Sequence, residues 1–153
     1  MTNLTDTSPT ALPASPASSR LTHVLLIGGD LLAFTLFAII GRRSHSEAAG
    51  LMAWFEVLKT AAPFMAGWFL VAPWLGAFRA RDYQAGAATS VAGVAQRTAL
   101  AWLVAAPLAL LLRAILLQRG IPVSFALITF ITNLTLLVAW RSLFAWLWRK
   151  RGM

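Results

Sequence analysis

The chain has 153 residues, of which 59% are hydrophobic and only 12% are charged, and its mean hydropathy is +0.72. A soluble domain usually carries about twice that charged fraction, so this composition indicates surface in contact with lipid. The formal net charge is +8, but the basic residues flank apolar runs and form no stripe, which argues against nucleic acid as a partner. The absence of cysteine excludes a disulfide framework, a thiol nucleophile and a thiolate metal site.

Residues 1–20 are rich in Ser, Thr, Pro and Ala and have almost no large apolar side chains, which predicts a disordered tail. The apolar run that follows, 21–40, is about 30 Å long as a helix and can therefore cross a bilayer. Asp30 lies near the centre of this run. A carboxylate at that depth costs about 2.5–3.5 kcal/mol unless it is paired, protonated or faces a polar cavity. The rest of the chain is therefore expected to supply a partner.

Three further apolar runs are expected to span the membrane, at 57–78, 98–117 and 121–140, and the last continues into an amphipathic end at 142–148. Because only Gln118–Gly120 separates the last two, they are expected to form a tight antiparallel hairpin. The predicted membrane domain covers residues 21–148, and a basic, interfacial C-terminus at 141–153 overlaps its end. The expected fold is an all-α integral membrane bundle of four antiparallel helices with short loops and a disordered N-terminal tail.

Four spans place both termini on the same side of the membrane. Eight of the 13 Lys and Arg residues fall on the side of the termini, and the other five fall on the opposite side. This bias favours cytoplasmic termini. The chain is therefore expected in the cell membrane, inner or plasma, as a multi-pass protein.

Counting residues along each expected span from the same side of the membrane places Trp68 and Asn133 at about the depth of Asp30. The Trp68 indole can donate a hydrogen bond to this carboxylate, or it can simply pack. Asn133 either joins the same cluster or bonds between helices as structural glue. Arg113 lies roughly 9 Å from this layer and is the expected counter-charge of Asp30, although its side chain could equally extend to the headgroups. Arg141, at the end of the last run, is interpreted as a topology anchor.

The other six tryptophans fall near the expected membrane interfaces, as aromatic belts do. These six residues are Trp54, Trp74, Trp102, Trp140, Trp146 and Trp148.

A short polar segment, Gly41–His45, follows the first run. Arg42 and Arg43 could bind headgroup phosphate or, together with His45, a small anion. The alternative is a solvated interfacial loop. The sequence has no HExxH motif, nucleophile elbow or phosphate-binding loop, so we expect no catalytic residue, metal site or cofactor.

Taken together, several of these motifs resemble the family labelled domain of unknown function 3054, over roughly residues 21–141. The residues that carry the resemblance are Gly29-Asp30, Gly41–His45, Pro63-Phe64, Gly67-Trp68, Trp102, Pro107, Arg113, Phe125 and Arg141. The family consists of small prokaryotic membrane proteins with relatives in photosynthetic lineages. The resemblance implies an integral membrane protein of about four helices, with no assigned reaction and no catalytic residue.

The function expected from the sequence is that of a non-enzymatic accessory, assembly or interaction subunit in the membrane. Its partners would be the lipid bilayer and other membrane subunits or a second copy of the chain. The alternative is a small oligomeric transporter or channel for protons or a small anion, built around the Asp30 cluster.

Overall fold

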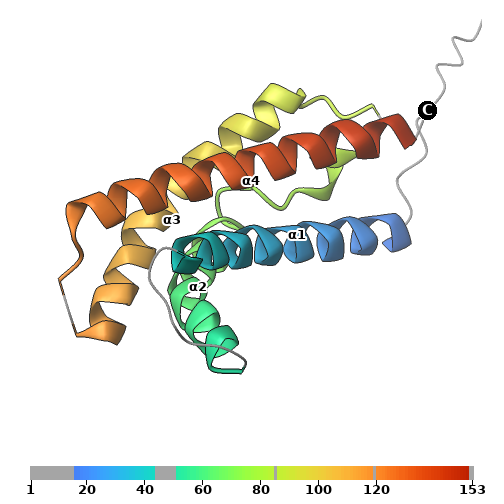
Figure 1. Cartoon of the computed structure of the whole chain (residues 1–153). Coiled ribbons are helices and arrows are strands. Elements are labelled where there is room, and N and C mark those ends of the chain that lie inside the picture. Colours follow the sequence, from blue (N-terminus) through green and yellow to red (C-terminus); the bar gives the residue numbers. More distant parts are fainter. Residues whose placement is uncertain (1–15, 44–50, 85, 119, 152–153) are drawn as a thin grey trace, which may run out of the picture.

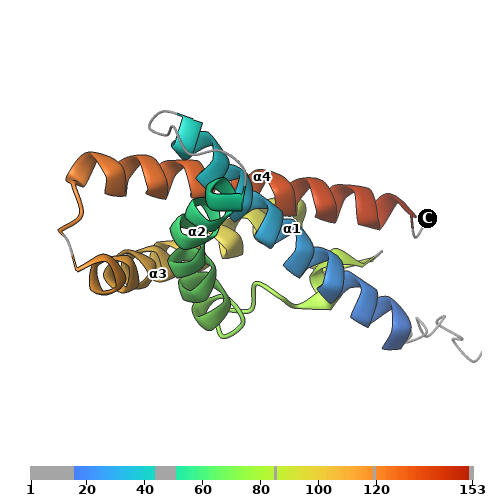
Figure 2. The same cartoon turned by 60° about the horizontal axis from the view of Figure 1, so that its bottom comes forward.

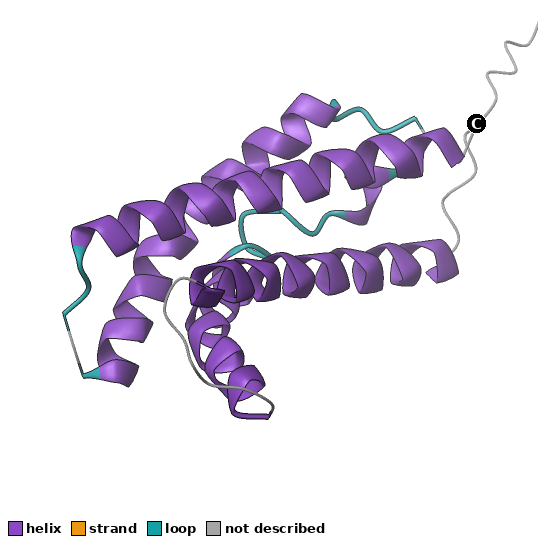
Figure 3. Cartoon of the chain, viewed as in Figure 1, coloured by secondary structure: helices purple, strands orange, loops and turns teal. Residues whose placement is uncertain are grey.

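The computed structural model describes residues 16–43, 51–84, 86–118 and 120–151. These residues form four α-helices: α1 (Pro16–Arg43), α2 (Leu51–Val71), α3 (Val91–Leu117) and α4 (Val123–Arg151). A short 3-10 helix, η1 (Ala80–Tyr83), lies between α2 and α3. The described part of the chain contains no strand, as Figure 3 shows, so the predicted all-α helical bundle is confirmed.

The four helices are arranged as two crossing pairs. In Figure 1, α1 and α4 run in opposite directions, so that the N-terminal end of α1 and the C-terminal end of α4 lie at the same end of the molecule. Helices α2 and α3 pack against each other and cross this pair, as the turned view in Figure 2 also shows. The segment with η1 enters between α1 and α4 and contacts both. This segment brings loop residues to the centre of the bundle.

Three helices are longer than the sequence predicts. Helix α1 begins at Pro16 and not at residue 21, because proline fits the first turn of a helix well. Helix α3 begins at Val91 because the Ser90 hydroxyl accepts a hydrogen bond of 3.0 Å from the Gly93 N–H and caps it. Helix α4 includes the expected amphipathic end at 142–148 and continues to Arg151. The predicted tail at residues 1–15 lies outside the described residues.

Helix α2 begins and ends earlier than the predicted second span, 57–78. Helix α2 ends at Val71, whereas the prediction extended the helix to residue 78. Three helices are long and apolar enough to cross a membrane: α3, α4 and the Ser19–Gly41 stretch of α1. Helix α2 is not among them, and it carries the charged residues Glu56 and Lys59. Among the described residues the structure thus gives three such spans where the sequence predicts four.

An aromatic core joins α1, α2 and α3. The rings of Phe34, Trp68 and Trp102 are completely buried, and their centroids lie 5.7–6.5 Å apart. The Trp102 indole donates a hydrogen bond of 3.0 Å to the Phe130 carbonyl oxygen on α4. Trp102, which the sequence analysis places near the membrane interface, is thus buried between helices, and its ring centroid lies 6.3 Å from that of Trp68.

Two glycines allow helices to approach closely. A Cβ added to Gly67 would lie 2.8 Å from the Cβ of Ala109 and 3.1 Å from the Ala105 carbonyl oxygen, so α2 and α3 could not pack at this distance with a larger residue. A Cβ added to Gly29 would overlap the Trp140 indole on α4. Close packing of this kind is typical of membrane helices, where backbones meet at small residues.

Candidate functional site

Asp30 forms an ion pair with Arg141, which lies near the other end of the chain. The Arg141 Nε donates to Oδ1 of Asp30 at 3.0 Å, and its Nη2 donates to Oδ2 at 2.5 Å. Both side chains have an exposed fraction of 0%. This bidentate geometry matches the planar guanidinium to both carboxylate oxygens, so the costly charge in α1 is fully paired.

Trp68 completes the surroundings of the carboxylate. Its indole Nε1 donates a hydrogen bond of 2.9 Å to Oδ2 of Asp30, which confirms the expected contact from α2. The guanidinium carbon of Arg141 lies 5.0 Å from the Trp68 ring centroid and 4.4 Å from that of Phe78. Aromatic faces stabilise a cation at this range, so the pair is held in a dry, ring-lined site.

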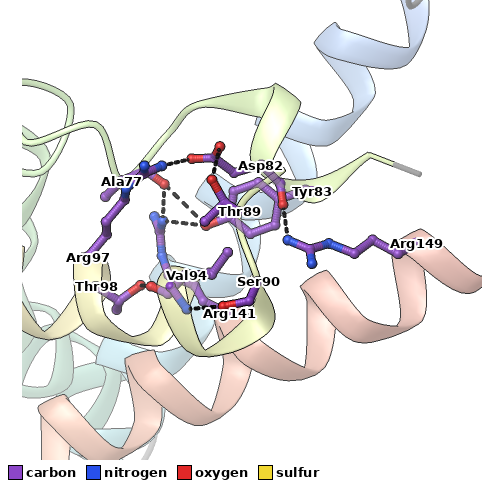
Figure 4. A network of polar contacts seen from close by, with 11 residues as sticks. Ala77, Asp82, Tyr83, Thr89, Ser90, Val94, Arg97, Thr98, Arg141 and Arg149 are labelled. Atoms are coloured by element: carbon purple, nitrogen blue, oxygen red, sulfur yellow. Dashed lines mark hydrogen bonds and ion pairs between the residues drawn. The ribbon is translucent and has the colours of Figure 1, made fainter. Parts of the chain in front are cut away.

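Arg141 also fixes the segment between α2 and α3. Its Nη1 donates to the Ala77 carbonyl oxygen at 2.5 Å and to the Tyr83 hydroxyl at 3.1 Å. The turn that follows α2 presents this carbonyl, and it uses Gly76 with a φ of +73°, a backbone region that glycine tolerates. Figure 4 shows Arg141 reaching from α4 toward Ala77 and Tyr83. One side chain thereby joins α4, α1 and the loop segment.

The Tyr83 hydroxyl is both an acceptor and a donor in this site. It accepts from Arg141 and donates to the Ala77 carbonyl oxygen at 3.2 Å. Burial raises the pKa of Tyr83 above its ordinary value of 10.0, against the opposing effect of Arg141. The hydroxyl therefore keeps its proton, which the bond to Ala77 requires.

The expected counter-charge of Asp30, Arg113, is not its partner. The guanidinium of Arg113 lies over the Phe125 ring, 4.5 Å from the centroid, while Arg141 makes the ion pair. The prediction failed because it ended the last membrane span at residue 140 and so placed Arg141 at an interface. Since α4 continues for ten residues beyond Arg141, this side chain lies well inside the helix. The apolar residues after position 141, with no proline or glycine before 152, were the available signal.

Asn133 is buried but lies outside this cluster. It precedes Arg141 by eight residues on α4, which corresponds to about 12 Å along a helix. Its Nδ2 donates to the Thr129 carbonyl oxygen at 3.0 Å, within the same helix. Its Oδ1 and the Thr129 hydroxyl are buried and have no hydrogen-bond partner among the described residues. Of the four residues predicted to form one cluster, the structure thus brings together Asp30 and Trp68.

A second polar network surrounds Asp82 in η1. Its carboxylate accepts hydrogen bonds from the Thr89 hydroxyl at 2.9 Å and from Arg97 on α3. Its carbonyl oxygen accepts from Arg149 on α4 (Figure 4). This network ties η1 to α3 and α4. The sequence analysis did not single out Asp82, although an acid in a loop rich in arginines is a usable signal.

The predicted anion contact at Arg42, Arg43 and His45 lies outside the described side chains. Within the described ranges, no group of three or more His, Cys, Asp or Glu residues is placed to hold a metal ion.

Comparison with known protein families gives a match over most of the chain. Residues 27–144 match the family model described as "Protein of unknown function (DUF3054)". The match extends from the turn of α1 before Asp30 to the turn of α4 after Arg141, so it includes both members of the buried pair. The comparisons with curated proteins and with solved structures gave no match.

Proposed function

Since the chain belongs to the DUF3054 family, whose description names no activity, we propose a function from its own geometry. We propose that it is a non-enzymatic membrane subunit that binds a helix of another membrane protein through a groove between α3 and α4. This groove is the single observation that carries the proposal. The buried cluster around Asp30 fixes α4, one of the two helices that form the groove.

The groove is lined mainly by small side chains. Its walls include Ala95 and Ala99 on α3, together with Thr135 and Ala139 on α4, and its volume is about 560 Å³. On each helix the two residues are four positions apart, so they lie one turn above each other on one face. Small residues at this spacing allow the backbone of a third helix to approach closely in a bilayer.

Gln96 adds a polar group at the same groove. Its side chain is exposed, and it makes no hydrogen bond to any described residue. An amide that faces lipid in an apolar helix is costly, and a hydrogen bond to a neighbouring helix offsets that cost. Gln96 therefore supports a protein occupant and gives the contact a fixed orientation.

The bonding of the Asp30 pair supports a structural role for it. A proton carrier must gain and lose its proton and must reach water on at least one side. Asp30 instead accepts three hydrogen bonds from Arg141 and Trp68 and has an exposed fraction of 0%. Because a bidentate arginine stabilises the ionised carboxylate, the pair favours a fixed contact over a transport cycle.

Site-specific photocrosslinking in native membranes tests this proposal. A benzophenone side chain at Ala99 or Ala139 should give an adduct of defined mass, and one at Leu103 serves as control. Leu103 is also on α3 and is 55% exposed, but it does not line the groove. A mass of twice the chain identifies a second copy as the occupant. Equal adducts from groove and control positions, or none from the groove, would overturn the proposal.

Flux measurements in proteoliposomes address the transport alternative. If the chain carries protons or a small anion through the Asp30 cluster, a flux should be present and Asp30→Asn should abolish it. We expect no flux above that of empty liposomes for either the wild type or the variant. A flux that depends on Asp30 in correctly folded protein would replace the subunit proposal with the transport function.

A further inference from the structure

A second groove lies between α2 and α3. It has a volume of about 340 Å³ and apolar walls that include Leu58 and Ala62 on α2 and Leu116 and Leu117 on α3. Two cations also line it, Lys59 and Arg113. The lining comes from the first half of α2 and the last two turns of α3, so the groove lies toward one end of the bundle.

Arg113 has a positive charge without an anion. Among the described residues, Arg113 makes no hydrogen bond or ion pair. It makes a cation–π contact with the Phe125 ring, whose centroid lies 4.5 Å from the guanidinium carbon. The ring lies against the guanidinium, which carries five N–H donors in its plane. These donors are the groups that bind phosphate oxygens in a bidentate manner. The donors of Arg113 are therefore available to bind an anion.

Lys59 provides a second, weaker cation at the same groove. Its ammonium lies 3.8 Å from Oε1 of Glu56, and both side chains are about half exposed. An exposed pair of this kind contributes little, so the ammonium can turn to a stronger anion at low cost. Arg113 lies one turn before the end of α3, a depth at which a long side chain meets lipid headgroups.

We propose that this groove binds an acidic phospholipid, with its phosphate on Arg113 and Lys59 and an acyl chain along the apolar wall. Charge complementarity decides the occupant: an apolar groove with two cations requires a ligand that is both anionic and apolar. An apolar protein helix satisfies the walls alone, and free phosphate satisfies the cations alone. A basic pocket between membrane helices is a recognised arrangement for anionic headgroups.

Native mass spectrometry of the full chain tests the proposal, with phosphatidylglycerol and phosphatidylcholine as probes. Arg113→Gln should weaken phosphatidylglycerol binding about fivefold, the effect of one surface charge near anionic lipid. The matched control is Lys150→Gln, which removes the same charge from another cation that lies over a ring, that of Trp146 at 4.0 Å, but lines no part of this groove. Because Lys150 lies outside the groove, the control should weaken binding less than Arg113→Gln does.

Two further arms separate the possible ligands. Ala62→Phe fills the groove without changing charge and should also weaken phosphatidylglycerol binding, so it tests the apolar wall if Arg113→Gln fails to fold. Inorganic phosphate at millimolar concentration should not displace the bound lipid. Equal losses in Arg113→Gln and Lys150→Gln, equal retention of the two lipids, or displacement by inorganic phosphate would each overturn the proposal.

Discussion

Breaking the Asp30–Arg141 pair should destabilise the bundle more than any other single change at the site. Arg141→Met removes four hydrogen bonds, two to Asp30, one to the Ala77 carbonyl and one to the Tyr83 hydroxyl. It leaves a buried carboxylate whose remaining partner is the Trp68 indole. Removing one partner of a buried ion pair typically costs about 3–5 kcal/mol, and the number of lost bonds places this variant near the middle of that range, about 4 kcal/mol.

Asp30→Asn should cost less, about 2 kcal/mol, because Arg141 keeps Ala77 and Tyr83 as acceptors and the amide oxygen can replace one carboxylate oxygen. The double variant leaves no lone charge in the bundle. Its loss should therefore fall below the sum of the two single losses by about 2 kcal/mol, which is the coupling free energy of the pair.

Reversible unfolding in mixed micelles, followed by far-ultraviolet circular dichroism, measures these free energies. The control cycle is Glu56→Gln with Lys59→Met, an exposed pair 3.8 Å apart on α2. Its coupling should stay below about 0.5 kcal/mol. A coupling free energy between Asp30 and Arg141 that is no larger than that of the exposed pair would refute the reasoning that the buried pair holds the helices together.

Three further variants test the surrounding packing by thermal unfolding in detergent. Gly29→Ala should cost about 1–3 kcal/mol because its new Cβ overlaps the Trp140 indole, whereas Gly28→Ala has open space around it and should stay within about 0.5 kcal/mol of wild type; similar losses would contradict the close approach of α1 and α4. Trp68→Phe should cost about 1–3 kcal/mol through the lost N–H bond to the buried carboxylate, and an unchanged melting temperature would rule that bond out as stabilising. Asn133→Leu should be neutral or stabilising because the Oδ1 atom it removes has no partner among the described residues, and a large loss would reveal a missed contact.

The sequence determined the class of the protein and the need for a buried partner. Long apolar runs can satisfy their backbone only as helices in lipid, so composition alone predicts an all-α membrane bundle. Asp30 stands out for the same reason, since a charge in such a run must be paired. Its contact with Trp68 also followed from counting residues, because depth along a helix is fixed by a rise of about 1.5 Å per residue.

Only the tertiary structure decided which cation pairs with Asp30. Arg113 and Arg141 are equally plausible by type, and the choice depends on where α4 ends and on how the helices cross. Neither quantity is local, since the crossing of α1 and α4 depends on Gly29 meeting Trp140, two residues 111 positions apart in the chain. The contacts of Arg141 with Ala77 and Tyr83 depend on a loop that enters the bundle. A hydropathy profile cannot predict these contacts, because it averages over side chains and contains no information on where a turn lies in space.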